Sequence, residues 1–378
     1  MSRWLKIGAA WAIELVVLFI VAEIVSVFFL PSPLGFYHPQ MLMQSNSRRI
    51  YDHEPNQRAF TIDQPFVTNS MGFRDEREVP ANKDGEFRIL SLGDSLAVGL
   101  GVSQEDTYAR RLEALLRPRY GAVRVINAGV GCYSTWQEVD LLKEKGLKVQ
   151  PDIVMLEFFW NDLYVRSANV APLSSSYTGD PPLWQYVRWL KRSRVLSYLR
   201  ERFEIVWFKI FPSFDWGHQQ MIYEGRTSPY LEQAYSDVAA SLEEFASLAR
   251  IHRFVPILIV FPMPGQVHRP DAATHMQRRM EAIARRVGLP TFDLLPTLRQ
   301  GYPATRDIYI PWDNTHLSPR GHELVAKVLE QYLDENHLVP PHVAGRLRTH
   351  RMENGRHEEE SAAIGSVVSN EAYGPRQK

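Results

Sequence analysis

The sequence predicts a three-layer α/β domain on a parallel sheet of about five strands, preceded by one N-terminal transmembrane helix. From Phe87 to Leu333, short apolar runs alternate with helical patterns, as in parallel α/β sheets. A long, mostly apolar run, Ile7–Leu30, precedes this region. The chain has 378 residues, 45% of them hydrophobic, which is enough for a sizeable core with additions.

The composition excludes some classes of protein and of site. The 43 basic and 43 acidic residues balance, so no overall field favours nucleic acid. The single cysteine, Cys132, excludes an internal disulfide and a site with several thiolate ligands.

The run Ile7–Leu30 is predicted to be an uncleaved membrane anchor (residues 1–30). As a helix it is about 36 Å long, enough to span a bilayer. The alternative is a cleaved signal peptide, but the run is longer than a usual signal core and no A-x-A-like site follows it. Arg3 and Lys6 precede the run, and no Lys or Arg follows until Arg48. The positive-inside rule therefore predicts a single-pass protein with its bulk outside the cytoplasm.

Two glutamates, Glu14 and Glu23, interrupt the apolar run. Nine residues at about 100° each place them on opposite faces of a helix, so one partner helix cannot meet both. They either contact other membrane subunits or are tolerated with local water.

Residues 31–83 are predicted to be a linker that becomes a wrap on the following domain. The segment lacks a long periodic pattern and should form loops and short strands, because prolines recur in it. These are Pro31, Pro33, Pro39, Pro55, Pro65 and Pro80. Within it, Arg74 either faces a site or pairs with a surface acid, and we expect the second.

The regular alternation defines a domain over residues 84–336. The predicted strands are Phe87–Leu92, Ala122–Asn127, Asp152–Phe158, Val255–Phe261 and Thr291–Leu294. The predicted helices are Thr107–Leu116, Gln137–Lys145, Tyr230–Arg250, Gln277–Val287 and Ser318–Leu333, the last with Ser318 as its N-cap.

Two segments depart from this alternation. An insert at about 165–229 contains Pro181–Phe211, which mixes basic residues with Trp, Tyr and Leu. It is interpreted as a lid, as a basic amphipathic helix on the membrane surface, or as an ordinary helical insert packed on the core. Residues 337–378 are polar and charged and are predicted to be a disordered tail.

The chemistry is predicted to centre on Ser95. In FRILSLGDSL, the strand ends at Gly93, which we expect to turn the backbone through a positive φ. Ser95 then emerges at the carboxyl end of the strand, where open α/β sheets bind ligands. The candidate base is His316, in WDNTHLSP just before the last helix, with Asp313 three residues earlier to orient it.

A nucleophilic serine also needs donors for an oxyanion. The first candidate is the backbone N–H of Ser95. The second lies in NAGVGCYSTWQ, after the second strand, and the third is the side-chain amide of Asn161, after the third strand.

These residues resemble the bacterial SGNH/GDSL hydrolases: GDSL around Ser95, the glycine block NAGVGCYST, Asn161–Asp162, and DxxH at Asp313–His316, in the family order. The resemblance implies a flavodoxin-like sheet, with Ser95 as nucleophile, His316 as base and Asp313 as its partner. It implies that Asn161 and the second-strand loop are oxyanion donors.

Two positions depart from the family pattern. Cys132 occupies the usual glycine slot of the second block, so Cys132 is expected to supply the N–H, with Gly131 as the alternative. Phe159 replaces the glycine of the third block.

The expected function is that of a membrane-anchored serine esterase, on the periplasmic side of a bacterial inner membrane, acting on O-acetyl groups of an envelope or extracellular glycan. The mechanism requires no metal or cofactor. Expected partners are the ester substrate, the membrane and possible membrane subunits, but no nucleic acid. The alternatives are an O-acyltransferase acting on surface polysaccharide and a non-catalytic polysaccharide-binding accessory protein.

Overall fold

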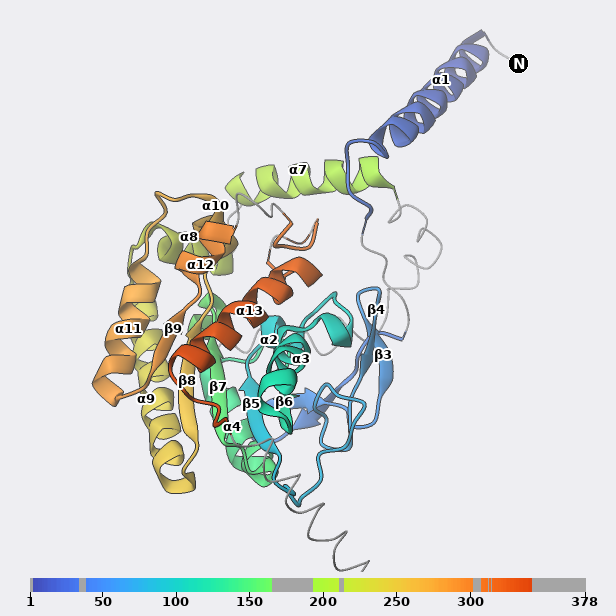
Figure 1. Ribbon diagram of the computed structural model, residues 1–378. Helices are drawn as coiled ribbons and strands as arrows, with labels where there is room; N and C mark the ends of the chain where they lie inside the picture. Colours follow the sequence, from blue (N-terminus) through green and yellow to red (C-terminus); the bar gives the residue numbers. More distant parts are fainter. Residues whose placement is uncertain are drawn as a thin grey trace, which may run out of the picture.

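The computed structural model describes residues 3–33, 39–164, 193–210, 214–301, 307–311, 313 and 315–341. At its centre lies a five-stranded parallel sheet with strand order β6-β5-β7-β8-β9 (Figure 1). This is the flavodoxin-like order, in which the first strand of the sheet lies between the second and the third. The strands are β5 (Phe87–Leu92), β6 (Val123–Asn127), β7 (Ile153–Phe158), β8 (Val255–Val260) and β9 (Thr291–Asp293).

Helices cover both faces of the sheet and divide the core into two layers. Alternate residues of β5 enter different layers: Ile89 packs in one and Leu90 in the other. The first layer contains α3 (Tyr108–Tyr120), α12 (Leu295–Gly301) and α13 (Pro319–Glu335). The second contains α4 (Thr135–Glu144), α9 (Pro229–His252) and α11 (His275–Val287). The predicted three-layer fold is therefore confirmed, with element ends shifted by a few residues.

The segment before the sheet forms two antiparallel hairpins, β1 (Met43–Asn46) with β2 (Ile50–His53), and β3 (Arg58–Thr61) with β4 (Gln64–Val67). Buried ion pairs join the first hairpin to α4. Arg49, which is fully buried, bonds Asp52 at 2.8 Å, Asp140 at 2.8 Å and Glu144 at 2.6 Å.

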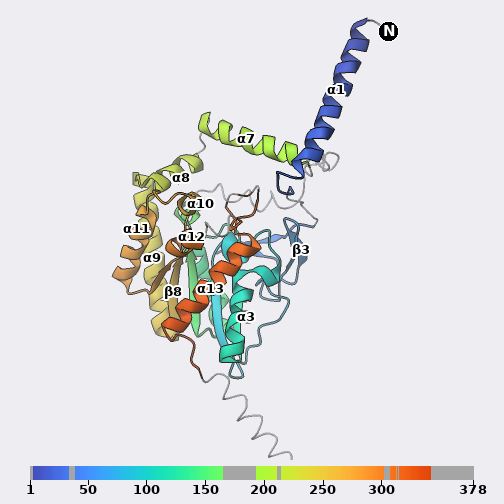
Figure 2. The ribbon, with the colours of Figure 1, turned by 45° about the horizontal axis from the view of Figure 1, so that its top comes forward.

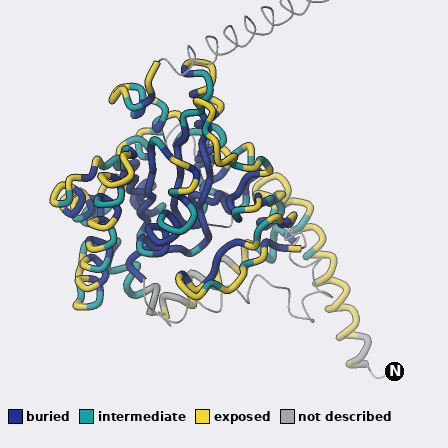
Figure 3. Tube along the Cα trace, turned by 90° about the horizontal axis from the view of Figure 1, so that it is seen from below, coloured by how far each residue is buried: buried dark blue, intermediate teal, exposed yellow. Residues whose placement is uncertain are grey.

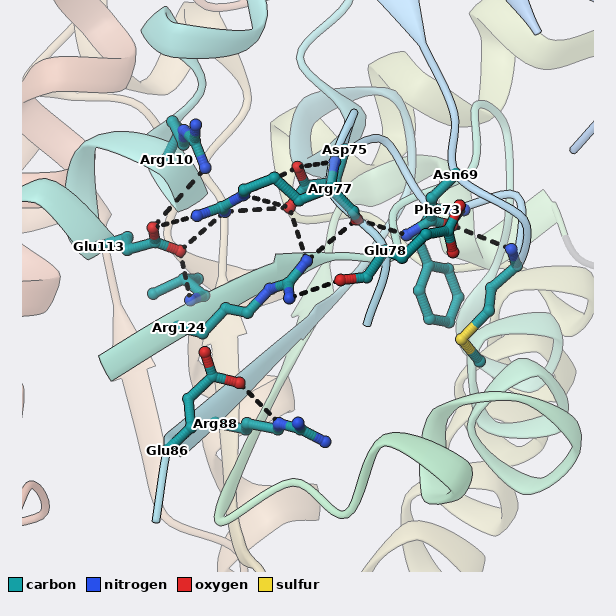
Figure 4. A network of polar contacts seen from close by, with 12 residues as sticks. Asn69, Phe73, Asp75, Arg77, Glu78, Glu86, Arg88, Arg110, Glu113 and Arg124 are labelled. Carbon is teal, nitrogen blue, oxygen red and sulfur yellow. Dashed lines mark hydrogen bonds and ion pairs between the residues drawn. The ribbon is translucent and has the colours of Figure 1, made fainter. Parts of the chain in front are cut away.

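A second polar network binds the end of this segment to the domain (Figure 4). The guanidinium of Arg77 bonds Asp75 at 3.0 Å and Glu113 of α3 at 2.7 Å. Arg124 of β6 bonds Asp75 at 3.3 Å. The end of this segment is therefore packed against the α/β domain.

The expectation for Arg74 is wrong: among the described residues its partners are backbone carbonyls and not a surface acid. Arg74 is buried and donates to the carbonyl oxygens of Val98, Gly99 and Val102, each at 2.6 Å. Burial lowers the pKa of Arg74 to about 9. The backbone carbonyls replace the hydrogen bonds to water that the guanidinium loses on burial. The same hydrogen bonds from Arg74 hold the turn that follows Ser95.

The N-terminal helix α1 (Arg3–Ser26) ends four residues before the predicted end of the apolar run, in a turn closed by Leu30 N–H and Ser26 C=O at 2.7 Å. The helix is long and apolar enough over Ile7–Ser26 to cross a membrane, and its most apolar stretch is wholly unburied (Figure 3). The same features also fit a signal sequence.

The predicted insert has two described helices with different surroundings. α8 (Phe214–Glu224) packs on the core through Ile222, which is buried, as an ordinary insert does. α7 (Arg194–Ile210) instead contacts α1. Residues 165–192, which include Trp184 and Arg188, lie outside the described residues.

At the carboxyl end the packed chain continues beyond the predicted boundary at 336, since Val339 is buried in the core. The remainder of the predicted tail, residues 342–378, lies outside the described residues.

Candidate active site

Ser95 begins a one-turn helix, α2 (Ser95–Val98), directly after β5. Asp94 is the N-cap of this helix, and its Oδ1 accepts a hydrogen bond from Leu96 N–H at 2.8 Å. Asn127, at the end of β6, donates to Ala97 C=O at 2.8 Å and so holds α2 from the neighbouring strand. Ser95 is therefore fixed at the carboxyl edge of the sheet.

Gly93 does not have the positive φ that we expected. Glycine is required there for space: a Cβ would lie 2.6 Å from the Cβ of Ala97 and 2.7 Å from Oε2 of Glu157. The chain turns without a positive φ at Gly93, while α2 and β7 approach too closely for a side chain.

The loop before α13 places Asp313 and His316 against Ser95. His316 Nε2 lies 2.9 Å from Ser95 Oγ, and His316 Nδ1 lies 2.7 Å from Asp313 Oδ2. An antiparallel bridge between Tyr309 and Leu317 closes the loop at its base. Three side chains from two distant parts of the sequence thus form one hydrogen-bonded line.

The environment of Asp313 favours its ionised form. Burial acts to raise the pKa of this carboxyl, but the hydrogen bonds from the His316 side chain and from the N–H groups of His316 and Thr315 outweigh it. The pKa of Asp313 therefore lies below its ordinary value, and the carboxylate is charged at neutral pH.

Asn161, in the turn Trp160–Tyr164 after β7, points its amide toward the same edge. Its Nδ2 donates to Asp94 Oδ2 at 2.6 Å. A primary amide has two hydrogens, so one is not used in the bond to Asp94. Asp94 thus holds both α2 and Asn161, a role that the sequence reasoning missed because it depends on two segments meeting.

The loop after β6 contains a tight turn from Val130 to Tyr133, closed by a 3.1 Å hydrogen bond. Cys132 has a φ of 60°, a left-handed conformation that favours glycine. Within the described residues, neither Gly131 N–H nor Cys132 N–H donates a hydrogen bond, so both candidates stay open. Burial, with the nearby Asp94, raises the pKa of the Cys132 thiol to about 12, which keeps it protonated.

Two buried glutamates lie beneath Asp94, and the sequence analysis did not single them out. Glu157 of β7 accepts a hydrogen bond from Tyr108 Oη at 3.3 Å. Glu138 of α4 is 1% exposed, and neither of its carboxyl oxygens has a hydrogen-bond partner among the described residues. Burial, together with the nearby Asp162 and Asp94 carboxyls, raises the pKa of Glu138 well above the ordinary value. Burial, together with Asp94, does the same for the pKa of Glu157.

Glu138→Gln is expected to stabilise the protein at pH 8 and to leave its stability at pH 5 nearly unchanged. Above about pH 4.5 the folded state holds a proton on Glu138 that the unfolded state has lost. Stability therefore falls as pH rises toward the folded-state pKa, by up to about 1.4 kcal/mol per pH unit.

Urea unfolding at pH 5 and pH 8 measures this effect. Glu335→Gln, at an exposed position on α13, is the matched control and should change neither value. Equal pH dependence in wild type and Glu138→Gln would show that Glu138 is ionised in the folded protein.

Comparison with solved structures finds similar folds at low identity. A two-domain esterase active on acetylated mannans is 18% identical, with a TM-score of 0.40 over 67% of this chain and 50% of that one. An acetyl xylan esterase is 13% identical, with a TM-score of 0.41 over 65% of this chain and 100% of that one. A catalytic mutant of an acetylxylan esterase from Geobacillus stearothermophilus is 16% identical, with a TM-score of 0.38 over 65% and 93%.

The chain spans about half the length of the two-domain esterase. At these identities and TM-scores, the likenesses carry no argument about substrate. The comparison with curated proteins found no significant match.

A family model gives the assignment. The model described as the GDSL-like lipase/acylhydrolase family matches residues 91–324, which is more than half of the chain. The match begins within β5, before Ser95, and ends in α13, beyond His316. The chain therefore belongs to the GDSL-like lipase/acylhydrolase family.

Proposed function

We propose that the protein is a membrane-anchored serine esterase that removes O-acetyl groups from an envelope or extracellular glycan. The observation that carries the catalytic part is the line from Ser95 Oγ through His316 to Asp313, with distances of 2.9 and 2.7 Å. Such a line activates a serine in acyl transfer.

In the first half of the reaction, Ser95 Oγ attacks the ester carbonyl and His316 Nε2 takes the hydroxyl proton. Nδ1–H donates to the Asp313 carboxylate, which selects the tautomer with a free lone pair on Nε2. The charged carboxylate also stabilises the imidazolium that forms. His316 then gives its proton to the leaving alcohol, and an acyl-Ser95 ester remains.

The negative charge that develops on the carbonyl oxygen is proposed to rest on three donors. These are the N–H of Ser95, the N–H of Cys132 or Gly131, and the Nδ2 of Asn161. Water then attacks the acyl-enzyme while His316 takes its proton, and acetate leaves as Ser95 regains its hydrogen. The hydrogen bond from Asn161 to Asp94 supports this assignment because it restrains the amide before substrate binds.

The proposed location is supported by α1. Arg3 and Lys6 precede its apolar span, and by the positive-inside rule we propose that the catalytic domain lies outside the cytoplasm, on the periplasmic side of a bacterial inner membrane. An enzyme held there meets acylated surface polysaccharide, which is why we propose a glycan acetyl ester as substrate.

A chain-length series tests the substrate. The full-length protein in detergent should hydrolyse p-nitrophenyl acetate faster than the butyrate, octanoate and dodecanoate esters, and should release acetate from an O-acetylated glycan. A preference for dodecanoate would identify a lipid ester as the substrate. Acetylated glycan formed from an acetyl donor, at the expense of free acetate, would instead identify an O-acyltransferase.

A further inference from the structure

One face of helix α7 is apolar and exposed. Among its described side chains, five large apolar ones have exposed fractions between 47% and 63%, and at about 100° per residue these five lie within about 60° of Phe203. They are Leu199, Phe203, Val206, Trp207 and Ile210. A soluble protein seldom exposes so continuous an apolar stripe unless it binds something.

Two arginines border this face. Arg200 lies about 60° from Phe203 on one side, and Arg202 about 100° on the other. The guanidinium of Arg202 lies over the Tyr198 ring, 5.1 Å from its centroid. An apolar stripe with an arginine on each edge is the pattern of helices that lie in the headgroup region of a bilayer, where guanidinium groups reach lipid phosphates.

The start of α7 is bound to the end of α1. The Glu23 carboxylate accepts hydrogen bonds from Ser193 Oγ, Arg194 N–H at 3.3 Å and Val195 N–H at 3.2 Å. Arg194 also donates to Ser32 Oγ at 2.8 Å, just beyond α1. Glu23 thus caps α7, and this contact differs from both alternatives that the sequence left for that residue.

This contact places α7 at the level where the apolar span ends. Glu23 lies one turn before Ser26, the last residue of α1. From there α7 runs across the direction of α1 rather than along it (Figures 1 and 2). An apolar stripe at that level meets the boundary between headgroups and acyl chains.

We propose that α7 lies in the headgroup region of an anionic bilayer, with the Phe203 stripe toward the acyl chains, as a second membrane attachment. The inference rests on the proposed anchor, α1. The loop with Asp313 and His316 leads into α13 at the end of that helix nearer α7, so this attachment turns the site's side of the domain toward the membrane (Figures 1 and 2). Such a pose favours substrates held close to the membrane surface.

Depth-dependent quenching in the full-length chain tests the proposal. Single variants Leu18→Cys in α1, Phe203→Cys on the stripe and Ser197→Cys, about 120° from Phe203, are labelled with an environment-sensitive fluorophore. At pH 7 the Cys132 thiol is protonated and reacts slowly with the label, so the introduced cysteine is labelled preferentially. The unsubstituted protein, treated in the same way, measures the remaining labelling of Cys132. Each variant must first match the wild-type melting curve.

The labelled proteins are placed in nanodiscs of phosphatidylcholine and phosphatidylglycerol that carry lipid-attached quenchers. We expect strong quenching at Leu18 and at least about twofold more at Phe203 than at Ser197. Quenching at Leu18 alone, or equal quenching at Phe203 and Ser197, overturns the inference about α7 and leaves the anchor. No quenching at Leu18 overturns the anchor and this inference with it, while p-nitrophenyl acetate hydrolysis tests the esterase separately.

Discussion

Ser95→Ala is expected to lower kcat for p-nitrophenyl acetate by roughly 10⁴-fold or more, with no change in the melting temperature beyond a few degrees. The variant removes the oxygen that forms the acyl-enzyme, and no neighbouring group replaces it. The Cys132 thiol nearby has a pKa of about 12 and stays protonated, so it is a poor substitute nucleophile.

Release of p-nitrophenol by the full-length protein in detergent measures this loss. The matched control is Ser241→Ala, on α9, where the hydroxyl donates only to Asp237 C=O within its own helix. That control should retain the wild-type rate. A Ser95→Ala protein as fast as wild type would mean that Ser95 is not the nucleophile.

Asp313→Asn is expected to lower kcat by roughly 10³–10⁴-fold while substrate affinity changes little. The amide has the shape of the carboxylate but not its charge. An Asn nitrogen facing Nδ1 selects the other imidazole tautomer, which places the proton on Nε2, where it faces Ser95 Oγ. The charge that stabilises the imidazolium is also lost.

Initial rates as a function of substrate concentration separate kcat from KM for this variant. Asp307→Asn, an exposed position in the same loop, is the control and should match wild type. Because the pKa of Asp313 is lowered, its carboxylate stays charged down to below about pH 4, and wild-type activity should not titrate with this group above that pH. Activity of Asp313→Asn within twofold of wild type would mean that another group orients His316.

Much of the fold was predictable from the sequence because its signals are local. Phe87–Leu92 is a short, mostly apolar run, and the structure has a buried strand over the same residues. Ser318 and Pro319 mark the start of a helix, and α13 begins there, with Ser318 capping it through Gly321 N–H at 3.1 Å. Each of these signals is carried by a few neighbouring residues, so no knowledge of distant contacts is needed.

The positions of the candidate site residues were also predictable, because they follow from local signals. Ser95 follows a strand and His316 precedes a helix, and the rules of parallel sheets bring both positions to one edge. The four short motifs in the family order made the expectation specific, and the match to residues 91–324 supports the family.

Other features were decided only by tertiary contacts. Arg74 looked like a surface residue, but it binds carbonyls that lie 24 to 28 residues further along the chain. Gly93 looked like a turn glycine, but the limit on its side chain comes from Glu157 of the adjacent strand. The residues adjacent in sequence to Arg74 and Gly93 carry no signal of these distant contacts.

By itself, therefore, the sequence determined the class of fold, the order of the strands along the chain and the three side chains of the candidate triad. The tertiary structure decided which carboxyls beneath Asp94 are buried with a raised pKa, and that Glu23 caps α7 across 170 residues of sequence. The physical reason is that backbone propensity and apolar patterning act over a few residues, whereas burial and charge pairing depend on whichever distant segment the fold brings into contact.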